Sequence, residues 1–196
     1  RYSMQQGNPM LRPEMNHDVS LAAVWKFMQA GVSYQVVKNA ILHRGTVQNG
    51  NDNAILIYYD NFDRNIPTMQ AMISASPTIG IWYPRITFAV VKQWLTMNSL
   101  GEDVKLNQPI PVVSFGNTFR LPKGFMLNLD YTYQGKGDSR VYHMLKATNQ
   151  ANISLRKTFL KDALSVELHA NNIFDDETVL MRMYSDTYTL KQWSKV

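Results

Sequence analysis

Three polar side chains have the chemical types that acid-base or nucleophilic catalysis uses: Ser154, Glu167 and His169. Glu167 and His169 are two residues apart in an alternating segment, and a hairpin register that pairs Phe159 with Leu164 places Ser154 opposite His169. Catalysis needs groups that point at one another and at a reacting atom. Any polar strand face produces the spacing seen here, so we expect no enzymatic activity.

Metal-ligating residues are present, but they do not follow a ligand pattern. Cysteine is absent, and the four histidines are widely separated: His17, His43, His143 and His169. Asp52, Asp60 and Asp63 lack the Asp-x-Asp-x-Asp spacing and the glycine of a calcium loop. The eleven methionines, including Met69, Met72, Met126, Met181 and Met183, are more typical of adaptable packing than of soft-metal ligands. We therefore predict no catalytic, cofactor-binding or metal-binding residue, and no cofactor.

The charge and hydropathy patterns exclude two further classes of protein. The net charge is +5, but the Lys and Arg residues are scattered singly, whereas nucleic-acid sites cluster them on one face. We predict no nucleic-acid partner. The 45% of hydrophobic residues suits a folded chain. No apolar run approaches the roughly 18 residues of a spanning helix, so the sequence argues against membrane helices.

Alternation of apolar and polar residues is the dominant pattern. From Phe125 to Tyr133, every odd residue is apolar or aromatic and most even residues are polar. Such a period of two predicts a strand with two different faces. The same alternation recurs in further segments, which bring the expected strands to about eight: 19–27, 32–36, 69–75, 86–90, 113–121, 151–156 and 164–171.

The links between these strands are alternately short and long. We predict short turns at Gln29-Ala30-Gly31, Pro122-Lys123-Gly124 and Leu160-Lys161-Asp162-Ala163, and long polar links over 42–53, 95–108, 134–146 and from 175 onward. The second turn pairs Leu121 with Phe125 and has the composition of a type I turn followed by a left-handed glycine. Short turns at one end and long links at the other are typical of an outer-membrane barrel.

The two faces of the expected sheet differ in a way that favours a barrel. The register that pairs Phe159 with Leu164 also sets Arg156 opposite Glu167 and Asn152 opposite Asn171, which forms a polar ladder on one face. Aromatic residues fall near the strand ends: Phe27, Phe125 and Phe159 beside short turns, and Trp94, Tyr131 and Tyr133 beside long links. Two aromatic girdles indicate membrane interfaces. A soluble sandwich, with the apolar face as its core, remains an alternative.

Three segments resemble a known family in their order and spacing. Gly7-Asn8-Pro9-Met10-Leu11-Arg12-Pro13-Glu14 resembles an element that enters a strand from an extracellular loop. Residues 154–164 resemble the periplasmic hairpin before the penultimate strand, and Asn171-Asn172-Ile173-Phe174-Asp175 resembles the signature at the outer end of that strand. The whole chain thus resembles the barrel of TonB-dependent receptors, in the Bacteroidota form described as an outer membrane protein β-barrel family.

The resemblance implies a fold and a function. Residues 1–196 would be the C-terminal part of a transmembrane antiparallel up-and-down β-barrel, about eight strands of probably twenty-two, without the plug domain or the closing strand. The implied function is energy-coupled nutrient uptake across the outer membrane of a Gram-negative cell. The implied partners are outer-membrane lipid, a TonB-type energy-coupling protein that binds the missing N-terminal region, and a surface lipoprotein lid. The alternatives are a soluble all-β carbohydrate- or ligand-binding sandwich and a small self-contained outer-membrane barrel.

Overall fold

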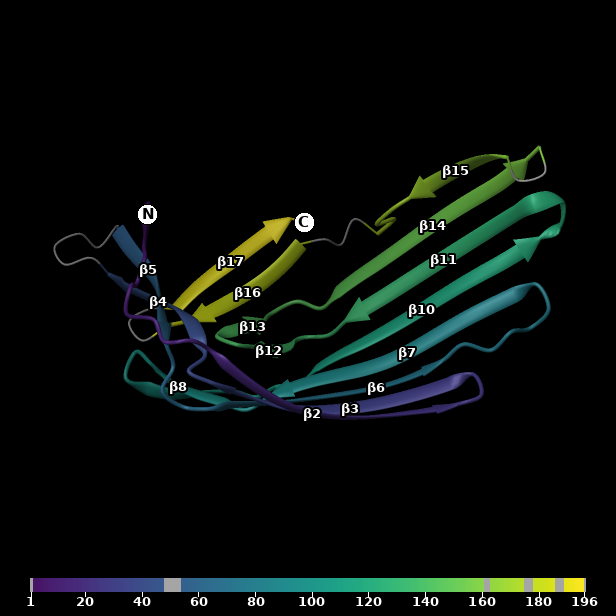
Figure 1. The fold of residues 1–196 in the computed structure, drawn as a ribbon. Helices are drawn as coiled ribbons and strands as arrows, with labels where there is room; N and C mark the ends of the chain where they lie inside the picture. The colour runs from purple at the N-terminus through teal and green to yellow at the C-terminus, as the bar shows by residue number, and fades with distance from the viewer. Residues whose placement is uncertain (1, 48–53, 161–162, 175–177, 186–188, 196) are drawn as a thin grey trace.

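The structure is a computed structural model that describes residues 2–47, 54–160, 163–174, 178–185 and 189–195. Its largest element is an antiparallel sheet of eight strands, in the order β15-β14-β11-β10-β7-β6-β3-β2. We call this sheet the wall (Figure 1). It confirms the predicted all-β fold and all eight expected strands: β2 (Met15–Trp25), β3 (Met28–Lys38), β6 (Ile66–Ala75), β7 (Trp82–Gln93), β10 (Ile110–Leu121), β11 (Phe125–Gln134), β14 (Thr148–Phe159) and β15 (Leu164–Ala170).

Links of two to six residues join successive wall strands at one end, which we call the turn end. The predicted turn at Gln29-Ala30-Gly31 is wrong, because these residues lie inside β3 and the chain reverses between Trp25 and Met28. Lys26, with φ of 52°, supplies the left-handed backbone in place of a glycine. The Ala-Gly pair misled the prediction, since Gly31 sits in the strand with ordinary van der Waals room beside Met72.

The turn between β10 and β11 has the predicted length but a different conformation. Leu121 pairs with Phe125 as expected, which leaves the three residues Pro122–Gly124 as the loop. Gly124 is left-handed, with φ of 76°, but Lys123 also has a positive φ of 63°. A type I turn needs a φ near −90° at the second central residue, so the predicted turn type is wrong although its residues are right.

The predicted long links at the other end are not irregular loops. They contain further strands, which together form a structure that we call the cap (Figure 1). β1 (Tyr2–Gln6), β5 (Ala54–Asn61) and β4 (Ile41–Val47) make one sheet, and β8 (Leu95–Ser99) and β9 (Glu102–Leu106) make a hairpin. A four-stranded sheet contains β12 (Gly137–Ser139), β13 (Tyr142–Met144), β16 (Thr178–Tyr184) and β17 (Thr189–Lys195).

The hydrophobic core lies in and under the cap and not between two layers of the wall. Its buried side chains come from the cap strands and from the adjoining ends of the wall: Val37, Ala40, Leu42, Phe62, Ile66, Leu95, Met97, Leu106, Val141 and Met183. The apolar face of the wall, by contrast, is exposed at many positions, such as Leu21 and Phe88. Within the described residues, no helix is long and apolar enough to cross a membrane.

Candidate pore wall and outer cap

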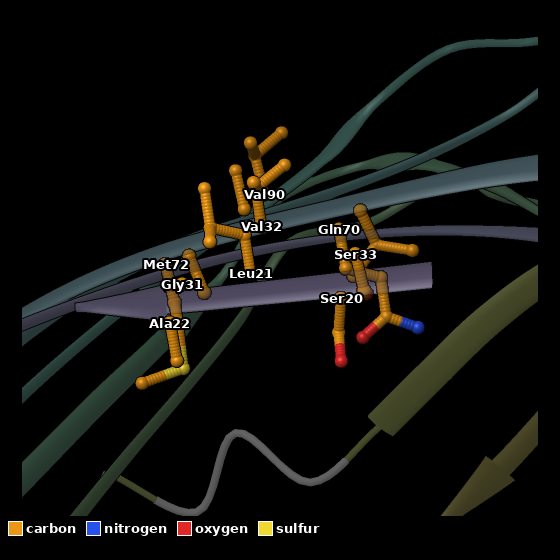
Figure 2. Close-up of a pocket in the computed structure, with 12 residues that line it drawn as sticks. Ser20, Leu21, Ala22, Gly31, Val32, Ser33, Gln70, Met72 and Val90 are labelled. Atoms are coloured by element: carbon orange, nitrogen blue, oxygen red, sulfur yellow. The ribbon is translucent and has the colours of Figure 1, made fainter. Parts of the chain in front are cut away.

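Neighbouring residues of the wall project from opposite faces, as the alternation predicts. Figure 2 shows Leu21, Val32 and Val90 on one face, and Ser20 and Gln70 on the other. The register joins Leu21, Val32, Ala71 and Val90 in one cross-strand row, and Ser20, Ser33, Gln70 and Val91 in the next row. The apolar face therefore continues from strand to strand. We call the opposite face the polar face.

Hydrogen bonds between strands run across the polar face. The Asn128 amide links two strands, because its Oδ1 accepts from the Thr118 hydroxyl (2.8 Å) and its Nδ2 donates to Ser154 Oγ (2.9 Å). Ser74 and Thr87 form a similar pair at 2.9 Å. Each of these bonds joins two residues that lie directly opposite each other in the backbone ladder, so the side-chain bonds reinforce the backbone register.

The hairpin of β14 and β15 has the predicted register for most of its length. Phe159 pairs with Leu164, Arg156 with Glu167, and Ser154 with His169. The last expected rung is absent from the ladder, which ends at Ala170 opposite Ile153. There the chain leaves the strand, and the Asn152 side chain accepts a hydrogen bond from the Asn172 backbone N–H (2.8 Å). Asn172 has a positive φ of 49°, which breaks the extended conformation.

The polar cluster on this hairpin differs from the expected ion pair. Glu167 and Arg156 are cross-strand neighbours, but in the described part of the chain the ion contact of Glu167 is with His169, at 3.5 Å between Oε1 and Nε2. This contact is ionic only when His169 is protonated. Both side chains are substantially exposed, so the contact is worth at most about 1 kcal/mol. The Ser154 hydroxyl oxygen accepts a hydrogen bond from the Asn128 side-chain amide. The expectation that Ser154, Glu167 and His169 carry no catalysis stays a prediction.

Aromatic rings and lysines mark both ends of the apolar face. At the turn end, Lys157 places its ammonium 4.1 Å from the ring centroid of Phe125 and 5.1 Å from that of Phe159. This cation-π contact explains how a lysine occupies the apolar side. The aliphatic stem of Lys157 can cover apolar surface while its ammonium lies against the aromatic rings at the strand end. At the cap end, Lys92 lies 5.2 Å from the Trp94 ring. The predicted aromatic positions at the strand ends are confirmed.

The apolar face also holds one buried polar side chain near the turn end. Asn117 is 8% exposed and lies between Leu129 and Pro84 in the ladder. Its Oδ1 accepts a hydrogen bond from the Trp82 indole N–H (2.9 Å), and the Trp82 ring stacks on Phe119 at 6.2 Å between centroids. The pairing satisfies the Asn117 side-chain oxygen and the Trp82 indole N–H, as a buried position requires.

The Gly7–Glu14 segment fastens the base of the β4–β5 hairpin to the start of β2. The buried Asn61 side chain donates to the carbonyls of Arg12 (2.9 Å) and Asn39 (2.8 Å) and accepts from the Arg12 N–H (2.7 Å). Asn8 donates to the Tyr59 carbonyl at 3.1 Å. The segment does enter a wall strand from the cap end, as predicted. Its polar contacts hold the β4–β5 hairpin to the start of β2, and we call this set of contacts the clasp.

Glu14 completes this clasp with a charge. Its carboxylate accepts from the Ile41 N–H at 3.0 Å and lies 3.3 Å from the Arg140 guanidinium. Burial opposes ionisation of Glu14, but the Ile41 hydrogen bond and the Arg140 charge outweigh it and lower the pKa of the carboxyl. Arg140 in turn exchanges backbone bonds with the buried Gln93 side chain, at 2.7 and 2.8 Å. The clasp therefore ties the cap to β7.

The possible metal ligands are dispersed or engaged elsewhere. The histidines lie on four different strands, β2, β4, β13 and β15. Asp63 pairs with Arg12 at 3.3 Å, Asp60 bonds Asn8, and Asp52 lies outside the described residues. Among the residues with a described position, no group of three or more His, Asp or Glu side chains is placed to hold a metal ion.

Comparison with known proteins identifies a family. The model of a family described as the outer membrane protein beta-barrel family matches residues 1–194, almost the whole chain. No curated protein and no solved structure gave a significant match. The match accords with the sheet described above, which has an exposed apolar face, a hydrogen-bonded polar face, and aromatic residues at both ends of its strands.

Proposed function

The chain belongs to the outer membrane protein beta-barrel family, and from this premise we propose that it forms part of the wall of a larger barrel that imports a nutrient with energy supplied by a TonB-type protein. The chain is an outer-membrane β-barrel protein of a Gram-negative cell. Its apolar face then meets lipid and its polar face lines the lumen. Membership of this family favours a membrane barrel over the soluble sandwich.

The observation that carries the proposal is the open sheet. β2 and β15 stand at opposite edges of the wall, and within the described residues no strand pairs with the outer side of either. Backbone groups at a sheet edge cannot remain unpaired in lipid. Further strands beside β2 and β15 would satisfy them, and the resulting barrel would be wider than eight strands.

The polar face supports the same conclusion. The interior of an eight-stranded barrel is only wide enough for side chains to fill it. Such a barrel would have to enclose Arg120, Asp130, Arg156, Glu167 and His169, and burying charges without full pairing costs several kcal/mol each. Arg120, for example, stacks on the Tyr83 ring at 4.5 Å, and no acid in the described part of the chain pairs with it. A wide hydrated lumen accommodates these groups without that penalty.

The proposal includes partners and excludes an enzymatic role. A TonB-type protein would engage a region N-terminal to residue 1, and a surface lipoprotein could cover the cap. The side chains of the polar face would line the path of the cargo and would not cleave it.

A binding experiment with the natural full-length protein tests the proposal. The protein is extracted from outer membranes with detergent and titrated with the purified periplasmic domain of its host's TonB protein. We expect a saturable complex and uptake that stops when the host's TonB gene is deleted. A full-length protein that binds no TonB domain and closes β2 onto β15 would instead be a small barrel with another function.

A further inference from the structure

A cleft of about 700 Å³ lies between two sheets of the cap. One side is a face of the β4–β5–β1 sheet, where His43 pairs with Tyr59 and Ile57 pairs with Gln5. The other side is a face of the second sheet, where Tyr142, Met183 and Leu190 form one cross-strand row. This volume is within the usual range of small-molecule sites.

The two sides of the cleft are held at a fixed separation. The buried Ser185 hydroxyl accepts from the Gly45 N–H (2.9 Å) and donates to the Gly45 carbonyl (3.0 Å), which ties the end of β16 to β4. His43 Nδ1 and the Tyr142 hydroxyl form a second tie at 2.6 Å. Met183 and Leu190 belong to or pack on the hydrophobic core. The cleft is therefore preformed, which reduces the entropic cost of binding.

Aromatic rings and hydrogen-bonding groups share the lining. The ring centroids of His43 and Tyr59 are 4.4 Å apart with a tilt of 41°, and the His43 and Tyr142 rings meet edge to face at 6.2 Å. All three rings are half-buried, so part of each remains accessible. Burial, assisted by the neighbouring Tyr59, raises the pKa of Tyr142 further above neutral, so its hydroxyl is a permanent hydrogen-bond donor at neutral pH.

The other lining residues narrow the class of ligand. Gln5 and Gln192 supply amide groups that both donate and accept hydrogen bonds. Among the residues with a described position, Lys191 is the single charged residue in the lining, and none of them contributes a carboxylate. A cationic ligand would lack a counter-ion here, and a purely apolar ligand would bury the amides and phenols unpaired. The chemistry suits a neutral ligand that has both apolar faces and hydroxyl groups.

We propose that this cleft binds a short neutral saccharide, with its C–H faces against the Tyr59 and Tyr142 rings and its hydroxyls bonded to Gln5, Gln192 and His43. The proposal deepens the proposed uptake function and rests on it, since the saccharide would be the cargo captured before entry into the lumen. A ring face and adjacent hydrogen-bonding groups together recognise a molecule that is apolar on its faces and polar at its edges.

Calorimetric titration of the full-length protein in detergent tests this inference. The probes are maltotriose, cellotriose and xylotriose, with the peptide Ala-Ala-Ala as the competing class. We expect at least one trisaccharide to bind and the peptide not to bind. Tyr59→Ala should weaken binding by about tenfold and Tyr142→Phe by about threefold, where tenfold corresponds to about 1.4 kcal/mol. Tyr34→Phe, on the exposed apolar face of the wall, is the matched control and should leave affinity unchanged.

Three results would overturn the inference. The first is that none of the trisaccharides binds, and the second is that the peptide binds and the cleft variants weaken its affinity. The third is that a trisaccharide binds both Tyr59→Ala and Tyr142→Phe as tightly as it binds the parent protein. Thermal unfolding checks that each variant is folded, and Gln192→Ala provides a third lining variant, at an exposed position. If saccharide binding fails while the TonB domain still binds, only this inference is lost. If TonB binding fails as well, the proposed uptake function is lost with it.

Discussion

Arginine substitutions at Val32 and Ser33 give a direct test of which face of the wall meets lipid. The two residues are neighbours in β3, and Val32 is paired with Leu21 and Ser33 with Ser20, whose side chains project from opposite faces (Figure 2). Val32 is four residues from Met28, which begins β3 at the turn end, or about 13 Å along the strand at roughly 3.3 Å per residue. With a strand tilt of about 40°, that is roughly 10 Å above the turn end, near the middle of an apolar band about 25 Å tall.

The expected costs follow from this depth. Val32→Arg places a charge between Leu21 and Ala71 near the bilayer midplane and should cost about 2–4 kcal/mol. Ser33→Arg lies at nearly the same height, beside Ser20 and Gln70, and extends into water. Its cost should stay within about 0.5 kcal/mol, as for an ordinary surface change.

The assay is guanidinium unfolding of the full-length protein folded into phosphatidylcholine vesicles, followed by tryptophan fluorescence. The unfolding midpoint should fall clearly for Val32→Arg and remain near that of the parent protein for Ser33→Arg. Equal losses for the two variants would refute the assignment of faces. A larger loss for Ser33→Arg would mean that the sheet is oriented inside out.

Three further predictions concern the cap and the polar face. Asn61→Ala removes three hydrogen bonds and should destabilise the cap by about 2–3 kcal/mol, measured as lost amide-exchange protection at Arg12. The control Asn65→Ala, at an exposed position, should leave that protection unchanged. Acid should act similarly at Glu14. The folded pKa of its carboxyl lies below the ordinary value of a glutamate, so its stabilisation is present above that ordinary value and is lost as the pH falls through the folded pKa. Protection of the Ile41 amide should drop over that range, and a constant protection factor would contradict the proposed contact. Glu167→Gln should change stability by less than about 1 kcal/mol, and a larger loss in chemical unfolding would show that its contact with His169 is shielded from solvent.

The wall could be predicted from the sequence because a strand with two different solvents on its two faces must alternate. That requirement fixed the faces and, through facing residues such as Phe119 and Leu127, the register of whole hairpins. The turn at Lys26 could not be predicted in the same way. A non-glycine residue with positive φ leaves no compositional signal there, while Gly31 offered a false one.

The cap was missed because its strands are short and only part of their side chains is buried in a core, so the alternation over about ten residues that marks the wall strands is absent. The β8–β9 hairpin did carry one local signal, since Leu100-Gly101 forms a two-residue loop in which both residues have positive φ. The cleft between the two cap sheets had no sequence signal. His43 and Tyr142 are 99 residues apart, and only the assembled cap brings them to 2.6 Å.

The most direct test of the proposed barrel wall is a cryo-electron microscopy structure of the natural full-length protein in lipid nanodiscs. The decisive observation is which strands pair with the outer edges of β2 and β15. We expect each edge to bond a strand from outside the eight described here, with Leu21 facing lipid and Asn128 facing the lumen. Backbone hydrogen bonds between β2 and β15 themselves would contradict the account and make a small self-contained barrel the correct structure.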